Sequence, residues 1–274
     1  MKRIWIGLWV VTLLLTGSCG SKEVNGIKFE KARAEKEVML AEGNDAPSCK
    51  VLLEVVYAVE TEGNRAVVTA INNAIEEQLL GMQGLTMQQA VDSFVSQYTM
   101  DYRKSLAEMY EQDKSDAEKH AWYEYHYSVT TEVQQAECEA LDDKVVATVK
   151  ANLDYFEGGA HGIEQQLVMN FDSETGKRLT LEDIFVPGYE HRLSELLLEK
   201  LMDQQDVKTL DELKAKDYLY TMDMFPSVNF IVKDDGLTFI YNPYEIAPYD
   251  KGRTEINVSF SEAEGILRKG EIGQ

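Results

Sequence analysis

Alternation of apolar and polar residues predicts β-strands in several parts of the chain. It runs through 122–129 and 145–156, and 163–171 follows with the same texture. Together with 49–59, these stretches are rich in β-branched and aromatic residues, which favour strands. Near the C-terminus the pattern predicts three more strands, over 228–232, 237–241 and 254–260. Because the turns between successive strands are short, we expect antiparallel meanders.

Apolar residues that recur with a period of 3.6 predict helices. The first such segment covers 65–80, and a long amphipathic helix near 87–118 follows the capping box that starts at Thr86. A further amphipathic helix is expected over 189–202. A Ser or Thr followed three residues later by an acidic residue is another helix-start signal. It predicts helices after Thr180, Thr209 and Ser261.

The order of these elements predicts an α+β fold, with antiparallel β-meanders packed against several helices. Residues 19–44 are expected to be a tether and an edge segment, because 27–41 combine a helix-like composition with strand-like spacing at both ends. A change of texture near residue 120 divides the rest into an N-terminal part, 45–120, and a C-terminal part, 121–274. No Pro-, Gly- or Ser-rich linker separates these parts, so we expect them to pack as one unit.

Residues 1–18 have the pattern of a lipoprotein signal peptide. Lys2 and Arg3 precede an apolar segment, 4–15, that is too short to span a bilayer comfortably, and small residues lead to Cys19. We therefore expect cleavage before Cys19 and lipidation of its thiol, with the lipid as the sole attachment to a membrane. The alternative is an ordinary secretory signal with a chance cysteine. The expected location is the bacterial cell envelope, on its periplasmic or outer-surface face.

Acidic residues outnumber basic ones by 48 to 27, which gives a formal net charge of −21. Loss of Lys2 and Arg3 with the signal peptide makes the charge more negative still. Such a field repels nucleic acids and anionic membrane surfaces and attracts cationic partners. Solubility alone is a sufficient reason for this composition, and a basic protein partner is the alternative.

Two cysteines, Cys49 and Cys138, remain besides Cys19. The envelope is oxidising, so a disulfide between them is one alternative and two buried free thiols are the other. None of the four histidines lies at metal-ligand spacing from another or from a cysteine: His120, His126, His161 and His191. Phosphate-loop, dinucleotide, nucleophile-elbow and zinc-protease motifs are absent from the sequence. We expect no metal and no cofactor, and the sequence identifies no catalytic residue.

Two predicted strands meet at the motif Gly158, Gly159, Ala160 and His161. Glycines allow the backbone to turn tightly or to approach another segment closely. His161 is interpreted first as a structural residue whose side-chain hydrogen bond ties this hairpin to its neighbours. The alternative is a binding residue that donates to a carbohydrate hydroxyl or to a partner's carboxylate.

The loop that starts at Pro243 is a second candidate. Pro243 and Pro248 stiffen it, and a stiff loop loses less entropy when it binds. Tyr244 and Tyr249 are amphipathic side chains of the kind enriched at interfaces. The alternative is that both tyrosines fold back and anchor the loop. These four residues and His161 are the candidate binding residues.

Five motifs carry a resemblance to a known family: 155–162, 170–172, 175–177, 179–185 and 241–249. They resemble a bacterial family of extracytoplasmic domains of unknown function. That family also forms the extracellular half of RsiV-type lysozyme-sensing anti-sigma factors and occurs in envelope lipoproteins. The preceding stretch, from Cys49 to Trp122, resembles the companion domain ahead of the catalytic part of PdaC-type peptidoglycan deacetylases. The resemblance implies an α+β fold and an envelope setting.

Two functions remain open, and a structural or housekeeping lipoprotein with no ligand is the third alternative. The resemblance implies neither anti-sigma signalling nor deacetylation here, because we expect neither a membrane-spanning helix nor clustered His and Asp ligands. The first function is a non-catalytic binding module for lysozyme-like or other basic cell-wall-active proteins, toward which the negative charge would steer the chain. The second is an accessory or hydrolytic enzyme acting on peptidoglycan or another envelope glycan. An enzyme requires a deep cleft with convergent titratable groups, whereas a binding module requires an exposed, loop-rich face with aromatic residues and an acidic rim.

Overall fold

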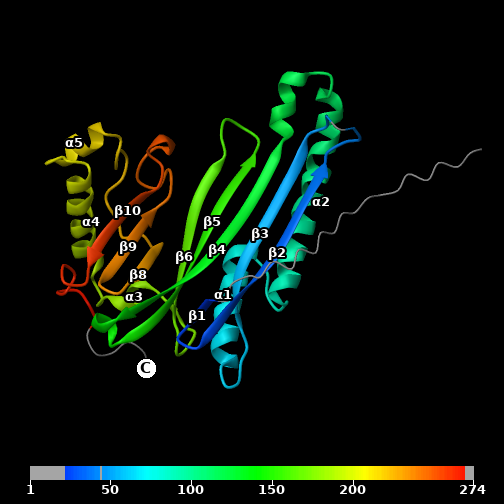
Figure 1. Cartoon of the computed structure of the whole chain (residues 1–274). Coiled ribbons are helices and arrows are strands. Elements are labelled where there is room, and N and C mark those ends of the chain that lie inside the picture. The colour runs from blue at the N-terminus through cyan, green and yellow to red at the C-terminus, as the bar shows by residue number, and fades with distance from the viewer. Residues whose placement is uncertain (1–21, 44, 269–274) are drawn as a thin grey trace, which may run out of the picture.

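A large β-sheet, a small β-sheet and helices on their faces make up the computed structural model, which describes residues 22–43 and 45–268 (Figure 1). The large sheet has seven strands in sequential order. They are β1 Lys22–Val24, β2 Ile27–Met39, β3 Ser48–Val59, β4 Tyr125–Cys138, β5 Lys144–Glu157, β6 Ile163–Asp172 and β7 Arg178–Leu179. Neighbours pair antiparallel except β3 and β4, which are parallel. The mixed α+β class predicted from the sequence is therefore confirmed.

The N-terminal edge of the sheet begins earlier than the sequence pattern predicts. β1 and β2 form a hairpin around Asn25 and Gly26, whose φ angles of 45° and 78° are those of a two-residue turn. β2 then pairs with β3 over twelve positions. The tether prediction is therefore wrong from Lys22 onward, and the ambiguous stretch 27–41 is mainly strand, because cross-strand pairing overrides its helix-like composition. The predicted signal peptide and Cys19 lie outside the described residues.

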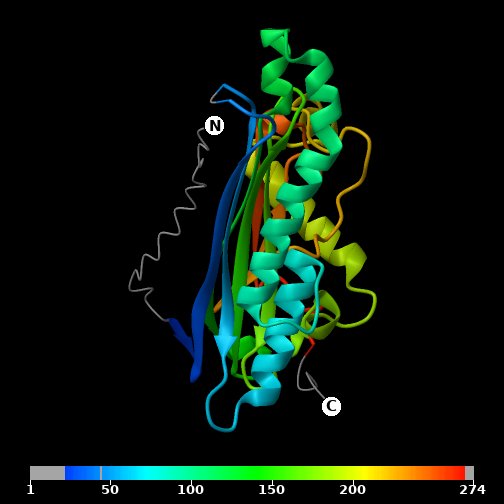
Figure 2. The same ribbon diagram turned by 90° about the vertical axis from the view of Figure 1, so that its right-hand side faces the viewer.

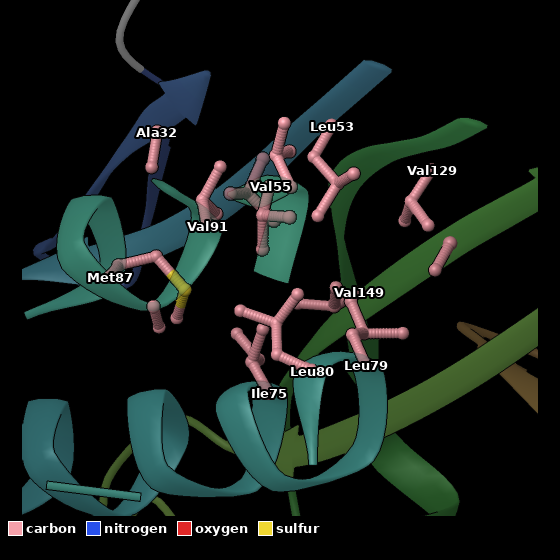
Figure 3. Packing of buried hydrophobic residues seen from close by; sticks show 14 of the residues in the cluster. Ala32, Leu53, Val55, Ile75, Leu79, Leu80, Met87, Val91, Val129 and Val149 are labelled. Atoms are coloured by element: carbon pink, nitrogen blue, oxygen red, sulfur yellow. The ribbon is translucent and has the colours of Figure 1, made fainter. Parts of the chain in front are cut away.

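Two helices connect β3 to β4 and cover one face of the sheet, as the two views show (Figures 1 and 2). They are α1, Arg65–Leu80, and α2, Met87–Asp113. A parallel pair of strands needs such a crossover. Figure 3 shows Ile75, Leu79 and Met87 of these helices against Leu53 and other apolar residues of the sheet. On the opposite face, polar side chains such as Lys50, His126 and Asp154 line the middle of the sheet, whereas Cys138 and Val146 pack into the second layer.

The predicted start of α2 is confirmed, since the side chain of Thr86 accepts a hydrogen bond from the backbone N–H of Gln89 at 3.3 Å. Its predicted end near Glu118 is wrong. The helix ends at Asp113, and a 3₁₀ helix, η1, follows over Ala117–Tyr123. Trp122 therefore belongs to η1, and the strand predicted to start there begins at Tyr125.

The second layer is a small antiparallel sheet with helices. Its strands are β8 Phe230–Lys233, β9 Gly236–Tyr241 and β10 Thr254–Ser259. Its helical elements are α3 Leu181–Ile184, α4 Glu190–Gln204, α5 Leu210–Ala215 and η3 Tyr249–Lys251. This layer has a separate apolar core, to which the ends of β4 and β5 also contribute. A short 3₁₀ helix, η2 Glu139–Leu141, connects β4 to β5.

The helix predicted after Ser261 is absent from the structure. Residues 261–266 form turns. The carboxylate of Glu262 instead accepts from the backbone N–H of Ser259, three positions earlier, at 3.0 Å. The backbone N–H of Arg268 then donates to Ile184 at 2.9 Å. Helical hydrogen bonds form at Ala263, to Ser259 at 3.2 Å, and at Leu267, to Ala263 at 3.1 Å, but they are not consecutive, and the chain from Ile266 onward pairs with the backbone around Ile184.

Three asparagine side chains join the small sheet to β6. Asn170 donates to the carbonyl of Phe230 at 2.8 Å, and Asn229 accepts from the backbone N–H of Val168 at 2.8 Å. Asn242 accepts from the backbone N–H of Gln166 at 2.7 Å. Hydrogen bonds between asparagine side chains and backbone groups therefore join the two sheets. They also fix the candidate loop after β9 to the large sheet.

In residues 22–43 and 45–268, none of the helices combines the length and the apolarity that crossing a bilayer demands.

Candidate functional site

The turn between β5 and β6 needs its two glycines for different reasons. Both have positive φ, 80° at Gly158 and 106° at Gly159. A Cβ on Gly158 would also lie 2.8 Å from the carbonyl oxygen of Trp122, whereas one on Gly159 would meet nothing within 4 Å. The first glycine therefore allows the hairpin to approach η1, and the second supplies only backbone freedom.

His161 ties this hairpin to the loop after β9. Its Nδ1 lies 2.8 Å from the carbonyl oxygen of Gly162. A carbonyl only accepts, so Nδ1 donates to it, and Nε2 lies 3.1 Å from the hydroxyl of Tyr244. The ring also stacks on Tyr249 with centroids 4.0 Å apart. We call His161, Tyr244 and Tyr249 the aromatic cluster.

The loop after β9, residues 242–249, is held by its own hydrogen bonds as well as by its prolines. The backbone N–H of Tyr244 donates to Ala247 at 2.9 Å, and Glu245 accepts from the backbone N–H of Asn242 at 2.9 Å. Tyr244 has a φ of 73°, which is uncommon for a bulky residue. A residue held in that conformation by its surroundings is a recurrent feature of binding and catalytic sites.

The two tyrosines of the loop differ in their exposure to solvent. Tyr249 is half-buried against His161, as the anchoring alternative requires. Tyr244 is 59% exposed, as the binding alternative requires. Pro248 is exposed and Pro243 is half-buried. The structure thus brings the five residues singled out from the sequence to one end of the molecule, where the β5–β6 turn meets the loop 242–249.

A segment that the sequence pattern did not single out lies next to this loop. Residues 216–229, which we call the strap, connect α5 to β8 without helix or strand. Large apolar side chains of the strap are exposed, and they are Tyr220, Met222, Phe225 and Val228. The signal in the sequence was a run of aromatic and Met residues with neither a 2- nor a 3.6-residue period.

The strap is fixed to the loop 242–249. Leu219, which is buried, has a φ of 52° and donates its backbone N–H to Ile246 at 2.8 Å. Asp217 also has a positive φ, of 67°. Such backbone conformations persist only where surrounding contacts hold them. The two segments therefore form a preformed pair of walls.

An open pocket of about 450 Å³ lies between these walls. Its size is in the range of ligand pockets in proteins. The strap and the loop contribute aromatic, aliphatic and acidic side chains to its lining, among them Asp217, Tyr220, Met222, Tyr244, Glu245 and Pro248. We call the strap, the loop 242–249 and the β5–β6 turn together the pocket face.

The carboxylates of the pocket are only lightly paired. Asp217 lies 3.8 Å from the ammonium of Lys251, and its side chain is 63% exposed. An ion pair of that length and exposure contributes little to stability. Glu245 accepts one backbone hydrogen bond, from Asn242. Both acidic groups are thus accessible to a cationic ligand.

At the base of the β5–β6 turn, Tyr98 of α2 donates to Glu157 at 2.5 Å. Burial and this carboxylate raise the pKa of Tyr98 far above its ordinary value. Its hydroxyl therefore remains a donor at any physiological pH. The contact fixes the end of β5 against α2 and so fixes the base of the hairpin.

Cys49 and Cys138 are buried free thiols, so the disulfide alternative is wrong. Cys49 pairs with Tyr125 at the start of β4, whereas Cys138 ends that 14-residue strand. About 40 Å of strand therefore separates the two sulfur atoms. Burial raises the pKa of Cys49 to about 11 and that of Cys138 to about 12. Neither is a reactive thiolate at neutral pH.

Among residues 22–43 and 45–268, no three His, Cys, Asp or Glu side chains gather as metal ligands would. His126 pairs with Asp154 at 3.2 Å on the open face of the large sheet, and His191 lies 3.5 Å from Glu195 on α4. His120 contacts the backbone carbonyl of Lys114 at 3.1 Å. Each histidine thus lies in a different part of the fold.

Part of the chain is similar to a curated bacterial protein. A curated relative is the peptidoglycan-N-acetylmuramic acid deacetylase PdaC of Bacillus subtilis (strain 168), which is 26% identical over 117 residues. The match covers 42% of this chain and 25% of the relative, so the chain spans about a quarter of that protein.

Solved structures of similar fold come from two other bacteria. A DUF3298 family member from Bacteroides fragilis is 28% identical, with a TM-score of 0.81 over 90% of this chain and 96% of the other. A DUF3298 family protein from Pseudomonas aeruginosa is 17% identical, with a TM-score of 0.55 over 88% and 95%, and is alike in fold alone. Residues 182–261 match the model of the same family, DUF3298, whose members are described as proteins of unknown function. The strap, the loop 242–249 and the small sheet lie within the segment that matches this family model.

Proposed function

We propose that this chain is a lipid-anchored envelope protein that binds a basic, cell-wall-active protein such as a lysozyme through the pocket face. The observation that carries the proposal is the pocket itself. It combines exposed tyrosines, accessible carboxylates and loops that are already fixed in place. Aromatic side chains with an acidic rim suit a basic protein surface, and preformed loops reduce the entropy cost of binding.

Placement of the expected anchor supports the same proposal. Two residues separate Cys19 from Lys22, the first residue of β1. A lipid on Cys19 would therefore hold β1 within about 10 Å of the membrane surface. Figures 1 and 2 place β1 at the end of the molecule opposite the β5–β6 turn. The 12-residue strand β3 spans this length, which is about 35 Å. The pocket face would then point away from the membrane.

Charge and relatives support a basic partner from the cell-wall environment. The net charge of −21 would accelerate the encounter with a cationic protein. The relative PdaC is named as a deacetylase of peptidoglycan, and the sequence resembles lysozyme-sensing anti-sigma factors of the RsiV type. A DUF3298 domain that captures a muramidase fits both relationships.

The test uses the chain from Lys22 onward, which keeps every described element, and a basic lysozyme as the probe. Binding is measured by calorimetry at about 10 and about 150 mM salt, where the Debye length falls from about 30 to about 8 Å. We expect binding that weakens at the higher salt. A lysozyme with succinylated lysines carries carboxylates in place of its ammonium groups, and it should bind more weakly.

Paired variants locate the surface. Tyr244→Ala removes an exposed ring from the pocket face and should weaken binding about tenfold or more, as for a central interface tyrosine. Met109→Ala removes a side chain of similar exposure from α2 and should change nothing. Absence of binding at both salt concentrations would refute the proposed function. Turnover of muropeptides by the purified chain would support a cell-wall enzyme instead.

A further inference from the structure

The pocket between the strap and the loop 242–249 has the composition of a receptor for a single cation. Tyr220 on the strap is 75% exposed and Tyr244 on the loop is 59% exposed. Both line the pocket, and each therefore has ring surface available to a ligand. The face of a tyrosine ring attracts a guanidinium or ammonium group within about 6 Å of its centroid.

Acidic groups complete this environment. Asp217 and Glu245 line the same pocket. In the described part of the chain, no lysine or arginine is among its lining residues. The nearest recorded cation is Lys251, whose ammonium lies 3.8 Å from Asp217. The pocket thus offers two carboxylates with only one long, exposed ion pair between them.

The remaining walls suit a long apolar stem. Met222, Ile246 and Pro248 contribute thioether and aliphatic surface to the lining. Arg and Lys side chains bury such a stem on apolar surface while their charged ends contact polar groups. Arginine fits better than lysine, because its planar group stacks on aromatic rings and donates to two carboxylates from one fork.

We propose that the pocket receives one arginine side chain of the protein partner, with its guanidinium at the rings of Tyr220 and Tyr244 and at the carboxylates of Asp217 and Glu245. The identity of the partner rests on the proposed function, whereas the chemistry of the pocket does not. The walls need no rearrangement, because the backbone N–H of Leu219 in the strap already donates to the carbonyl of Ile246 in the loop at 2.8 Å.

A small probe tests the pocket without the partner. N-acetyl-arginine amide is titrated into the chain from Lys22 onward, and the methyl signal of Met222 is followed by NMR. Its neutral isostere, N-acetyl-citrulline amide, is the control. We expect a saturable shift with a dissociation constant of about 1 mM for the arginine probe, as for a ligand of this size, and none for citrulline. Equal shifts from both probes, or none from either, would overturn the inference.

Substitutions separate ring, charge and bulk. Tyr220→Leu keeps an apolar side chain but removes the ring face, and should weaken binding of the arginine probe about fivefold, whereas Tyr220→Phe should bind as the parent does. Glu245→Gln keeps an acceptor for the Asn242 N–H but removes a charge, and should weaken binding about fivefold as well. Met109→Ala, on α2 and outside the pocket lining, is the control and should have no effect.

The two proposals fail separately. If lysozyme does not bind but the arginine probe does, the proposed function falls and the cation pocket stands. If lysozyme binds equally well to the parent and to Tyr220→Leu and Glu245→Gln, the arginine receptor is wrong while the function stands.

Discussion

Replacement of Asn242 by alanine should lower the free energy of unfolding, although it removes only a small side chain. The side chain of Asn242 is 4% exposed and makes two hydrogen bonds to the backbone of Gln166 in β6. Its Oδ1 accepts from the backbone N–H at 2.7 Å, and its Nδ2 donates to the carbonyl at 3.1 Å. It therefore joins the last residues of β9 to the large sheet, two positions before Tyr244.

The size of the effect follows from what the substitution leaves behind. The carbonyl of Gln166 keeps a second donor, the Asn229 side chain at 2.6 Å. The backbone N–H of Gln166 loses its recorded acceptor in a buried position, which costs about 1–3 kcal/mol. For a protein of this size, about 2 kcal/mol corresponds to a fall in melting temperature of about 4–8 °C.

Urea unfolding of Asn242→Ala, followed by circular dichroism, measures this loss. The control is Asn152→Ala, because Asn152 also contacts Gln166, accepting from its side chain at 2.8 Å, but lies at the surface. The control should cost less than about 0.5 kcal/mol. If both variants lose the same small amount of unfolding free energy, the asparagine side chains do not hold the two sheets together as argued.

Three further predictions follow from other parts of the fold. Gly158→Ala should cost about 1–3 kcal/mol in urea unfolding, because of its positive φ and the carbonyl of Trp122 2.8 Å away, while Gly159→Ala should cost less; equal costs would count against the close approach. Cys49 and Cys138 should resist a thiol reagent at pH 8 in the folded protein and react after unfolding, whereas fast labelling would mean that they are accessible. The Lys200 ammonium and the Ser259 backbone N–H lower the pKa of Glu262 to about 2. Since that pKa is below its unfolded value of about 4.3, stability is present above pH 4.3 and is lost as pH falls toward 2. Glu262→Gln should therefore be less stable than the parent at pH 6 and close to it at pH 2, and an unchanged difference would contradict this assignment.

Much of the fold could be predicted because local patterns and tertiary packing agree there. The helix over 65–80, the cap at Thr86 and the strands on both sides of Gly158 follow from periodicity and from turn chemistry alone. The hairpin of β1 and β2 also has a signal in the sequence, because Asn25-Gly26 is typical of a two-residue hairpin turn.

Other features depend on contacts between distant residues, which no local pattern records. β3 and β4 pair in parallel because α1 and α2 return the chain, and pairing with β3 makes 27–39 a strand despite its composition. The helix predicted after Ser261 stays a series of turns, and the chain that follows pairs with the backbone around Ile184. Each outcome was decided by a partner that lies far away in the sequence.

The candidate site was predictable in part. Gly-rich and Pro-rich motifs pointed to His161 and to Tyr244, and their contact at 3.1 Å joins two segments 83 positions apart. The strap was missed because exposed Tyr220 and Met222 look like core residues when only composition is considered. Their exposure depends on the folded surface, where they form the wall of the pocket that faces the loop 242–249.

The most direct test of the pocket face as a binding surface is hydrogen exchange of the chain from Lys22 onward, with and without a basic lysozyme. We predict slower exchange in the strap and in the loop 242–249, with no change on the polar face of the large sheet. Protection of that polar face instead, or an exchange pattern that lysozyme leaves unaltered, would contradict the account.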